Sequence, residues 1–148
     1  MRIVVDTNIV FSAMLNTNSQ LARILLQPKT RLNFYSTERL LLEIEEHSKK
    51  LKNISGYSEP EFKRIFEIFT RKIRFINVQL IPKEIYLRSL SLTENVDVDD
   101  TEFVALTEHI KGKLWSGDKE LRKGLENKNW NKFISTTDLF EICRIKKM

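Results

Sequence analysis

The stretch Arg2-Ile3-Val4-Val5-Asp6 places three apolar residues in succession, without polar alternation, directly before a carboxylate. Such a run predicts a short strand that is buried on both faces, as in a parallel sheet. Asp6 ends the strand. A carboxylate that directly follows three buried residues seldom lacks a partner, so Asp6 is the first candidate for a functional residue.

Strand and helix patterns alternate along the rest of the chain. Apolar spacing and turn residues predict further strands over 32–35, 76–80, 113–116 and 133–134. The same signals predict helices over 19–26, 36–51, 58–73, 85–92 and 99–112, and a last helix capped by Thr137. Gly112 predicts a left-handed helix end, and Ser58-Glu59-Pro60-Glu61 fits a capping box. This alternation indicates an α/β sandwich with a mainly parallel sheet.

Length and composition describe one soluble globular domain over residues 1–148. The 148 residues are 41% hydrophobic and 30% charged, with four Gly and three Pro, which excludes disordered and fibrous classes. The single cysteine, Cys143, cannot form an intramolecular disulfide, and the absence of a Cys/His cluster excludes a structural zinc site. Asp6 interrupts the first apolar run, so that run is neither a signal-peptide core nor a membrane span. We therefore expect a cytoplasmic protein.

The basic surplus lies in the first half of the chain. The net charge is +5, and residues 1–74 hold 13 Lys and Arg against 8 Asp and Glu. This surplus suits a polyanion such as nucleic acid, although it is equally compatible with solubility alone. Two clusters are candidate RNA contacts or solvated charged faces: Lys49, Lys50 and Lys52, and Lys119, Arg122 and Lys123.

Four acidic residues are expected at one rim of the sheet. Asp6 and Asp118 follow strands, Glu43 lies about two turns into the helix after the second strand, and Asp100 lies in the first turn of a later helix. Ligands of open parallel sheets bind outside the carboxyl ends of the strands. Clustered carboxylates need a cation, and an all-oxygen site suits Mg²⁺ or Mn²⁺, which support phosphoester hydrolysis.

Each acid also has a purely structural explanation. Asp100 and Asp118 could be helix N-terminal residues favoured by the dipole, and Glu43 could be a solvated helix residue. The two histidines, His47 and His109, are expected at helix surfaces because no Ser or Cys nucleophile stands near them.

Four segments together resemble PIN-domain ribonucleases. The strand and acid of Ile3-Val4-Val5-Asp6-Thr7-Asn8 resemble the opening signature of that family. Residues 97–106 look like its acidic loop and helix start, and residues 115–121 look like its later strand exit. Residues 133–140 are similar to the final strand and helix of VapC-like PIN proteins, the toxin components of type II toxin–antitoxin systems.

The resemblance implies a PIN-like three-layer α/β/α sandwich and a role for specific residues. It implies metal or water ligation by Asp6, Glu43, Asp100 and Asp118, with support from Thr7, Asn8 and Ser116. Asp99 competes with Asp100, and Glu120 takes a place that often holds a further Asp. Glu43 is preferred to Glu45 and Glu46 because it lies closest to the apolar face of its helix.

The activity that the resemblance implies is metal-dependent cleavage of RNA with Mg²⁺ or Mn²⁺. It further implies a protein antitoxin and a homodimer as partners. Two alternatives stay open: a housekeeping RNA-processing nuclease, and an interaction module without catalysis. A haloacid-dehalogenase phosphatase is excluded because Asn8 stands where a second Asp is required, and no Gly-rich phosphate loop is present.

Overall fold

The central sheet consists of parallel strands throughout the described residues. The computed structural model describes residues 1–28 and 31–147, and within them the strands are β1 (Arg2–Val5), β2 (Asn33–Thr37), β3 (Ile73–Ile76), β4 (Lys113–Trp115) and β5 (Phe133–Ile134). Their order is β3-β2-β1-β4-β5, and every adjacent pair is parallel. The predicted mainly parallel sheet is confirmed.

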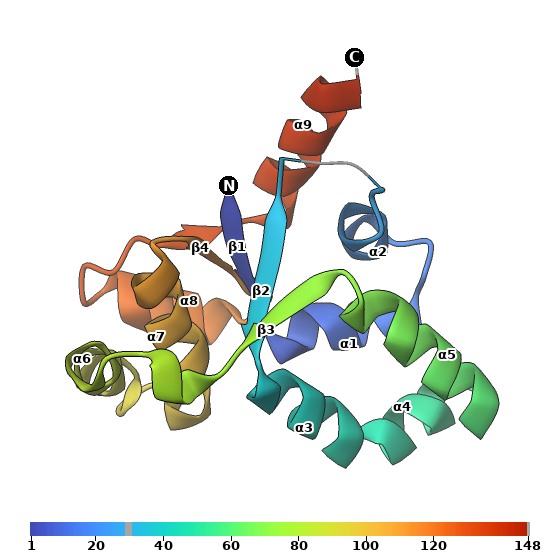
Figure 1. The fold of residues 1–148 in the computed structure, drawn as a ribbon, viewed down its shortest axis with the longest axis horizontal. Helices are drawn as coiled ribbons and strands as arrows, with labels where there is room; N and C mark the ends of the chain where they lie inside the picture. Colours follow the sequence, from blue (N-terminus) through green and yellow to red (C-terminus); the bar gives the residue numbers. More distant parts are fainter. Residues whose placement is uncertain (29–30, 148) are drawn as a thin grey trace.

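Helices cover both faces of the sheet, which confirms the predicted α/β/α sandwich (Figure 1). The helices are α1 (Thr7–Leu15), α2 (Gln20–Leu25), α3 (Glu38–Glu46), α4 (Ser48–Ser55), α5 (Glu59–Thr70), α6 (Lys83–Thr93), α7 (Thr101–Ile110), α8 (Lys119–Glu126) and α9 (Thr136–Lys147), with 3₁₀ turns η1 (Val78–Leu80) and η2 (Val98–Asp100). Helix α7 packs on β1, β2 and β4 and carries α6 on its outer side, whereas α1 packs against α2, α3, α4 and α5. Within the described part of the chain, no helix is both long and apolar enough to span a membrane.

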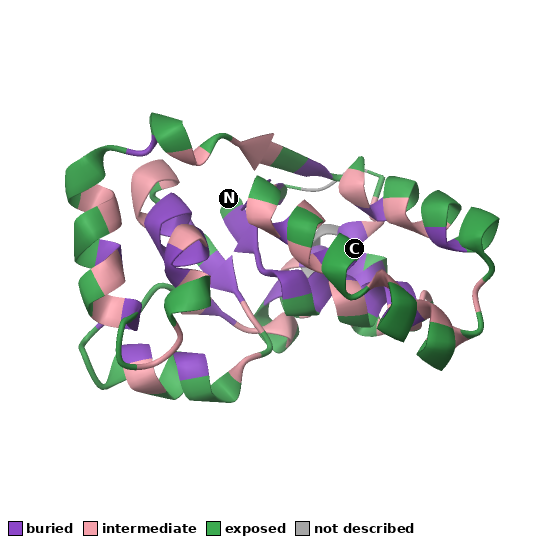
Figure 2. Cartoon of the chain, turned by 90° about the horizontal axis from the view of Figure 1, so that it is seen from below, coloured by how far each residue is buried: buried purple, intermediate pink, exposed green. Residues whose placement is uncertain are grey.

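The core is centred on β1. Ile3, Val4 and Val5 are completely buried, and Figure 2 shows buried residues gathered at the sheet and on the helix surfaces that face it. Phe34 on β2 lies 6.0 Å, centroid to centroid, from the Trp115 ring on β4. The Trp115 indole N–H donates to the Thr136 hydroxyl at 2.9 Å, which ties the sheet to the start of α9. The free Cys143 is buried in the same core.

Three expected elements differ from the structure. The helix expected over 58–73 ends at Thr70, because Ile73 already pairs with β2 as the first residue of β3. The long helix over 36–51 is two helices that meet at His47, and the break lets both α3 and α4 contact α1. The half-exposed strand over 76–80 is wrong, because β3 ends at Ile76 and the Asn77 side chain accepts from the Gln79 N–H to begin a 3₁₀ turn. Helix α1 has no counterpart among the expected elements.

Two helix caps also differ from expectation, whereas the capping box of α5 is confirmed with both of its hydrogen bonds. Ser135, and not Thr137, caps α9, since its hydroxyl accepts from the Asp138 N–H at 3.0 Å. At the end of α7 the left-handed residue is Lys111, with φ 56°, while the Gly112 N–H donates to the Thr107 carbonyl. Gly112 serves a different need: a Cβ there would lie 2.6 Å from the Arg2 carbonyl oxygen.

We expect opposite effects of two neighbouring substitutions at this helix end. Gly112→Ala lowers the free energy of unfolding by about 1–3 kcal/mol, because the new methyl group overpacks against the backbone of β1. Lys111→Gly raises it by up to about 1 kcal/mol, because glycine adopts the left-handed conformation without a Cβ penalty. Urea unfolding of both variants and the wild type measures the difference. The reverse order would show that Gly112 is the left-handed cap.

Candidate metal centre

The strand order places the ends of β1 and β4 at the position where ligands of open sheets bind. From β1 the chain continues to β2 and β3 on one side, and β4 and β5 lie on the other side. Val5 is paired with Trp115, the last residue of β4. Asp6, which follows Val5, therefore lies next to the carboxyl end of β4, and Asp118 follows Trp115 by three residues. The carboxyl ends of adjacent strands form a crevice where the strand order reverses.

A cavity of about 140 Å³ lies at this crevice. All four acids that the sequence singled out line it, together with two of the supporting residues, with Asp99 and with one acid that was not expected. The lining residues are Asp6, Thr7, Asn8, Glu43, Asp97, Asp99, Asp100 and Asp118. The structure therefore brings the predicted acids together, while their role as ligands stays a prediction.

Asp6 is the most deeply buried acid of the cavity, with 2% of its surface exposed. Its Oδ1 accepts from the Ile9 N–H at 3.1 Å and thereby caps α1. Burial raises the pKa of Asp6 from 3.8 to about 6, against the opposing effect of hydrogen bonds from Ser116 and the Ile9 N–H. The nearby carboxylates of Asp118 and Glu43 raise it further. Asp6 is thus held in place as an acid that resists ionisation without a compensating cation.

Asp97 was missed by the sequence analysis. One carboxylate oxygen each from Asp97, Asp100 and Asp118 lies within 4.8 Å of the others, the only such group of three metal-ligating side chains among the described residues. Asp97 precedes η2, and a 3₁₀ helix has three residues per turn, so residues 97 and 100 lie on the same side. Asp99 lines the cavity but is exposed and outside this group. The available signal was the i, i+3 pair of acids in the loop before α7.

Glu43 reaches the cavity from α3 and is held by a neighbour. The Thr7 hydroxyl donates to the Glu43 Oε1 at 2.6 Å, which orients the carboxylate. Arg39, one turn earlier on α3, donates from Nε to the Glu102 Oε2 at 3.2 Å. Glu102 follows Asp100 by two residues, so this ion pair connects α3, which carries Glu43, with α7, which begins directly after Asp100.

Asp118 is fixed by the turn that begins α8. Its Oδ1 accepts from the N–H groups of Glu120 and Leu121, both at 3.0 Å. The Ser116 Oγ accepts from the Asp118 N–H at 3.1 Å. The Glu120 side chain is exposed and does not line the cavity. One oxygen of Asp118 therefore caps α8, and the same carboxylate belongs to the group formed with Asp97 and Asp100.

The electrostatics of the cavity fit a hard divalent cation. Burial raises the pKa of Asp100, and the carboxylates of Asp97, Asp6, Asp118 and Glu43 raise it further. No Lys, Arg or His belongs to the residues that line the cavity. Oxygen donors without nitrogen or sulfur suit Mg²⁺ or Mn²⁺ better than zinc. Asp97, Asp100 and Asp118 could hold such an ion, with Asp6 and Glu43 beside them.

The candidate RNA contacts lie on two helices. Lys49 and Lys50 are exposed on α4, whereas Lys52 pairs with Glu59 and lies 5.5 Å from the centroid of the Phe62 ring. Lys119, Arg122 and Lys123 lie on α8, which begins at Asp118 in the cavity. Arg122 forms an ion pair with Glu126, with 3.3 Å between Nε and Oε2, and its guanidinium lies over the Phe133 ring. Of these two helices, α8 starts at the cavity and α4 does not.

We expect the stability of the metal-free protein to fall as pH rises, and Asp6→Asn to weaken that fall. The folded chain holds the Asp6 proton up to a pKa of about 6 and the unfolded chain only to 3.8, so this stabilisation is present below pH 4 and lost by pH 7. Its size is on the order of 3 kcal/mol at 1.36 kcal/mol per pKa unit. Thermal scans from pH 4 to 8 in EDTA, with wild type and Asp6→Asn, measure it.

Added Mn²⁺ should raise the melting temperature of the wild type more than that of Asp6→Asn. Binding to the folded state alone adds roughly 2.7 kcal/mol at a hundredfold excess over Kd. Asparagine can still accept from the Ile9 N–H, so the helix cap is preserved in the variant. Equal responses of both proteins to Mn²⁺ would show that Asp6 is not a ligand.

Comparison with known proteins agrees with this arrangement. The sequence model of the PIN domain matches residues 4–138, which is nearly the whole chain. Among curated proteins, none matches the chain significantly. The match begins within β1 and extends to the first turn of α9, so it includes the second half of β1, the strands β2 to β5 and every acid of the cavity. The chain belongs to the PIN-domain family, whose members are generally nucleases that use divalent metals.

Proposed function

We propose that the protein is a metal-dependent endoribonuclease that hydrolyses RNA phosphodiester bonds with Mg²⁺ or Mn²⁺. One observation carries the proposal: a PIN domain holds six acids around one cavity at the carboxyl end of its sheet, with three carboxylates within 4.8 Å of one another. An interaction module without catalysis would have no need to keep so many like charges together, because each raises the free energy of the folded state.

The proposed ligands are Asp97, Asp100 and Asp118, with Asp6 and Glu43 completing the site. A bound divalent ion would lower the pKa of a coordinated water and offset charge on the scissile phosphate. The chain itself supplies orientation. Thr7 fixes Glu43, the Ile9 N–H fixes Asp6, and the N–H groups that open α8 fix Asp118. Exposed Asn8 lies at the cavity and offers an amide donor for a phosphate oxygen.

A toxin role within a toxin–antitoxin system is the finer part of the proposal. The similarity of residues 133–140 to the last strand and helix of such toxins supports it. A small partner protein that binds the chain and blocks cleavage is expected to be encoded beside it. The absence of such a neighbour would favour a housekeeping RNA-processing nuclease with the same chemistry.

We expect RNA cleavage that depends on Mn²⁺ or Mg²⁺, stops in EDTA and leaves 5′-phosphate and 3′-hydroxyl ends. Asp6→Asn abolishes it, and Asp97→Asn lowers kcat/KM by at least about tenfold, because a ligand or its close neighbour is lost. End-labelled single-stranded and structured RNAs, resolved on denaturing gels, provide the measurement. Cleavage that survives EDTA, or that Asp6→Asn leaves unchanged, would contradict the proposal.

Glu120→Gln is the matched control for Asp97→Asn. It removes the same unit charge from an exposed side chain that does not line the cavity, so we expect kcat/KM within about twofold of wild type. If both substitutions lower activity equally, Asp97 acts only through the overall field and not as a ligand.

For RNA binding we expect a larger contribution from α8 than from α4. Lys119→Ala/Lys123→Ala should reduce the slope of log K against log salt by about 1.4, at 0.7 for each phosphate contact on a single strand. Lys49→Ala/Lys50→Ala removes the same charge from α4 and should change the slope less. Fluorescence anisotropy with labelled RNA from 50 to 300 mM salt makes the comparison. An equal or larger effect of the α4 pair would place the RNA path along α4.

A further inference from the structure

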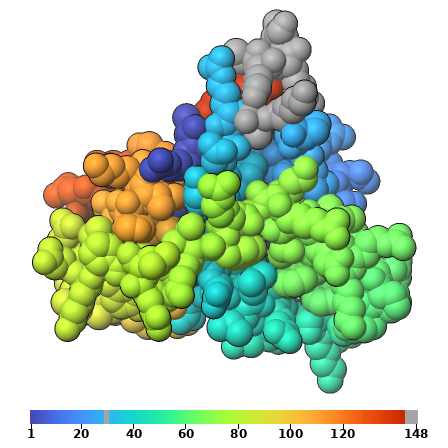
Figure 3. All heavy atoms as spheres, in the orientation of Figure 1, coloured from blue at the N-terminus to red at the C-terminus, as the bar shows by residue number. Residues whose placement is uncertain are grey.

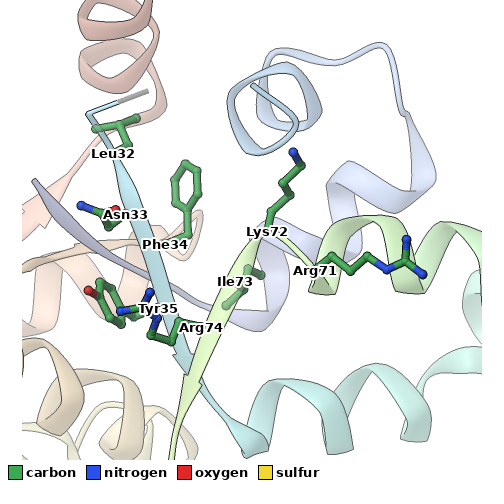
Figure 4. Close-up of a pocket in the computed structure, with 8 residues that line it drawn as sticks. All are labelled: Leu32, Asn33, Phe34, Tyr35, Arg71, Lys72, Ile73 and Arg74. Atoms are coloured by element: carbon green, nitrogen blue, oxygen red, sulfur yellow. The ribbon is translucent and has the colours of Figure 1, made fainter. Parts of the chain in front are cut away.

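A second cavity, of about 300 Å³, lies where β2 and β3 begin. It is lined by Leu32, Asn33, Phe34, Tyr35, Arg71, Lys72, Ile73 and Arg74, and we call it the β3 groove (Figure 4). β3 is the outermost strand on its side of the sheet. In Figure 3, atoms of β2 and β3 reach the surface between α5 and α6. The β3 groove is therefore an accessible site outside the acidic cavity.

The chemistry of the β3 groove is opposite to that of the acidic cavity. Three of its lining residues, Arg71, Lys72 and Arg74, are cationic and exposed, and none is acidic. Arg71 lies 3.6 Å from Glu67, but both side chains are exposed, so that pair is weak. Phe34 and Ile73 form an apolar floor that is almost fully buried. The β3 groove is thus lined by two cations of the turn before β3, Arg71 and Lys72, and by one cation of β3 itself, Arg74.

An aromatic ring lies beside one of these cations, Arg74, at the exposed edge of the sheet. Tyr35 and Arg74 are register partners on β2 and β3, and the Arg74 guanidinium carbon lies 5.7 Å from the centroid of the Tyr35 ring. Figure 4 shows both side chains on one side of β2, with Phe34 and Lys72 on the other side. Aromatic rings and guanidinium planes on which bases stack, next to cations for phosphates, are the features of single-strand nucleic-acid sites. An acidic peptide would use the charges but not the stacking surface.

We infer that the β3 groove binds single-stranded RNA outside the scissile bond, an inference that rests on the proposed ribonuclease function. Two strand spacings and two residues along the strands separate Arg74, the groove cation nearest to the acids, from Asp6, which amounts to about 12 Å between their backbones. Arg71 and Lys72 lie further from Asp6 along the strand direction. An RNA of several nucleotides therefore reaches both sites at once, whereas a trinucleotide over the acidic cavity does not reach the groove. The groove cations attract the RNA phosphates at a place where the acids of the cavity do not repel them.

The test compares two variants with equal charge loss. The groove variant is Arg71→Gln/Lys72→Gln/Arg74→Gln, and the control variant is Lys63→Gln/Arg64→Gln/Arg88→Gln, which removes three exposed cations that do not line the β3 groove. Binding of a labelled 20-nucleotide RNA is measured by fluorescence anisotropy in EDTA over a range of salt. Cleavage of that RNA and of a trinucleotide is measured in Mn²⁺. Circular dichroism and thermal scans establish that both variants fold.

We expect the groove variant to bind the 20-nucleotide RNA at least about tenfold more weakly, with a salt slope smaller by about two units. Its KM for this RNA rises, its kcat stays within about twofold, and its kcat/KM for the trinucleotide is unchanged. The control variant stays within about threefold of wild type throughout. An equal loss in both variants, or an equal loss on both substrates, would overturn the inference.

The outcomes separate this inference from the proposed function. A wild type that cleaves RNA, together with a groove variant that binds it normally, overturns the β3 groove alone. A wild type that does not cleave RNA overturns the proposed function, while anisotropy in EDTA still tests the groove. Polyglutamate is tested as a competitor of RNA. If it binds more tightly than RNA, and competes only when the groove cations are intact, the groove is assigned to an acidic peptide instead.

Discussion

The parallel pairing of β1 between β2 and β4 is the constraint on which the rest of the structure depends. This strand has neighbours on both edges and helices over both faces, so its three apolar residues are completely buried. The chain must leave such a strand at its carboxyl end, and the first residue there is Asp6. Burial of that carboxylate is unfavourable, and the Ile9 N–H and the Ser116 side chain offset only part of the effect, since its pKa still rises to about 6. The fold therefore carries an electrostatic cost at its centre.

Local turns then bring further acids to the same place. A 3₁₀ turn aligns Asp97 with Asp100, and the opening turn of α8 fixes Asp118 through two backbone N–H groups. The Arg39–Glu102 ion pair connects α3 with α7, and so connects two of the acid-bearing elements. Each of these interactions is small by itself. Together they hold like charges closer than an isolated chain would, and a metal site requires that arrangement.

Charge is segregated over this small domain, and the segregation has a consequence for a polyanionic substrate. Acids occupy the carboxyl end of the sheet, while the cations Arg71, Lys72 and Arg74 lie at the outer strand. A phosphate backbone is repelled from the acidic cavity unless a cation is bound there, and is attracted to the outer strand in either state. If the protein cleaves RNA as proposed, the field of the protein would therefore couple the binding of the RNA to the binding of the metal.

Much of this organisation was predictable from local patterns. Four of the five strands that the structure describes were expected, whereas the strand expected over 76–80 shares only Ile76 with β3. The four predicted acids all line one cavity. The failures share a cause. Alternation of Ile76, Val78 and Leu80 indicates a strand only if a neighbouring strand is available there, and Asn77 offers the backbone a competing turn. The break at His47 likewise reflects packing on α1, which the apolar stripe through Leu51 does not reveal.

The sequence by itself determined the fold class and indicated that Asp6, Glu43, Asp100 and Asp118 lie at one rim, because burial of a continuous apolar run and the position of a carboxylate after it are local properties. Only the tertiary structure decided which acid joins Asp100 and Asp118, since Asp97, Asp99 and Asp100 are neighbours in the chain and differ only in direction. It also decided that Gly112 is needed for its close approach to Arg2 and not for a left-handed turn. The approach of Gly112 to Arg2 joins distant segments, and no local pattern contains such a contact. Asp97 and Asp100 lie on the same side only because residues 98–100 form a 3₁₀ turn, and the i, i+3 spacing by itself does not establish that turn.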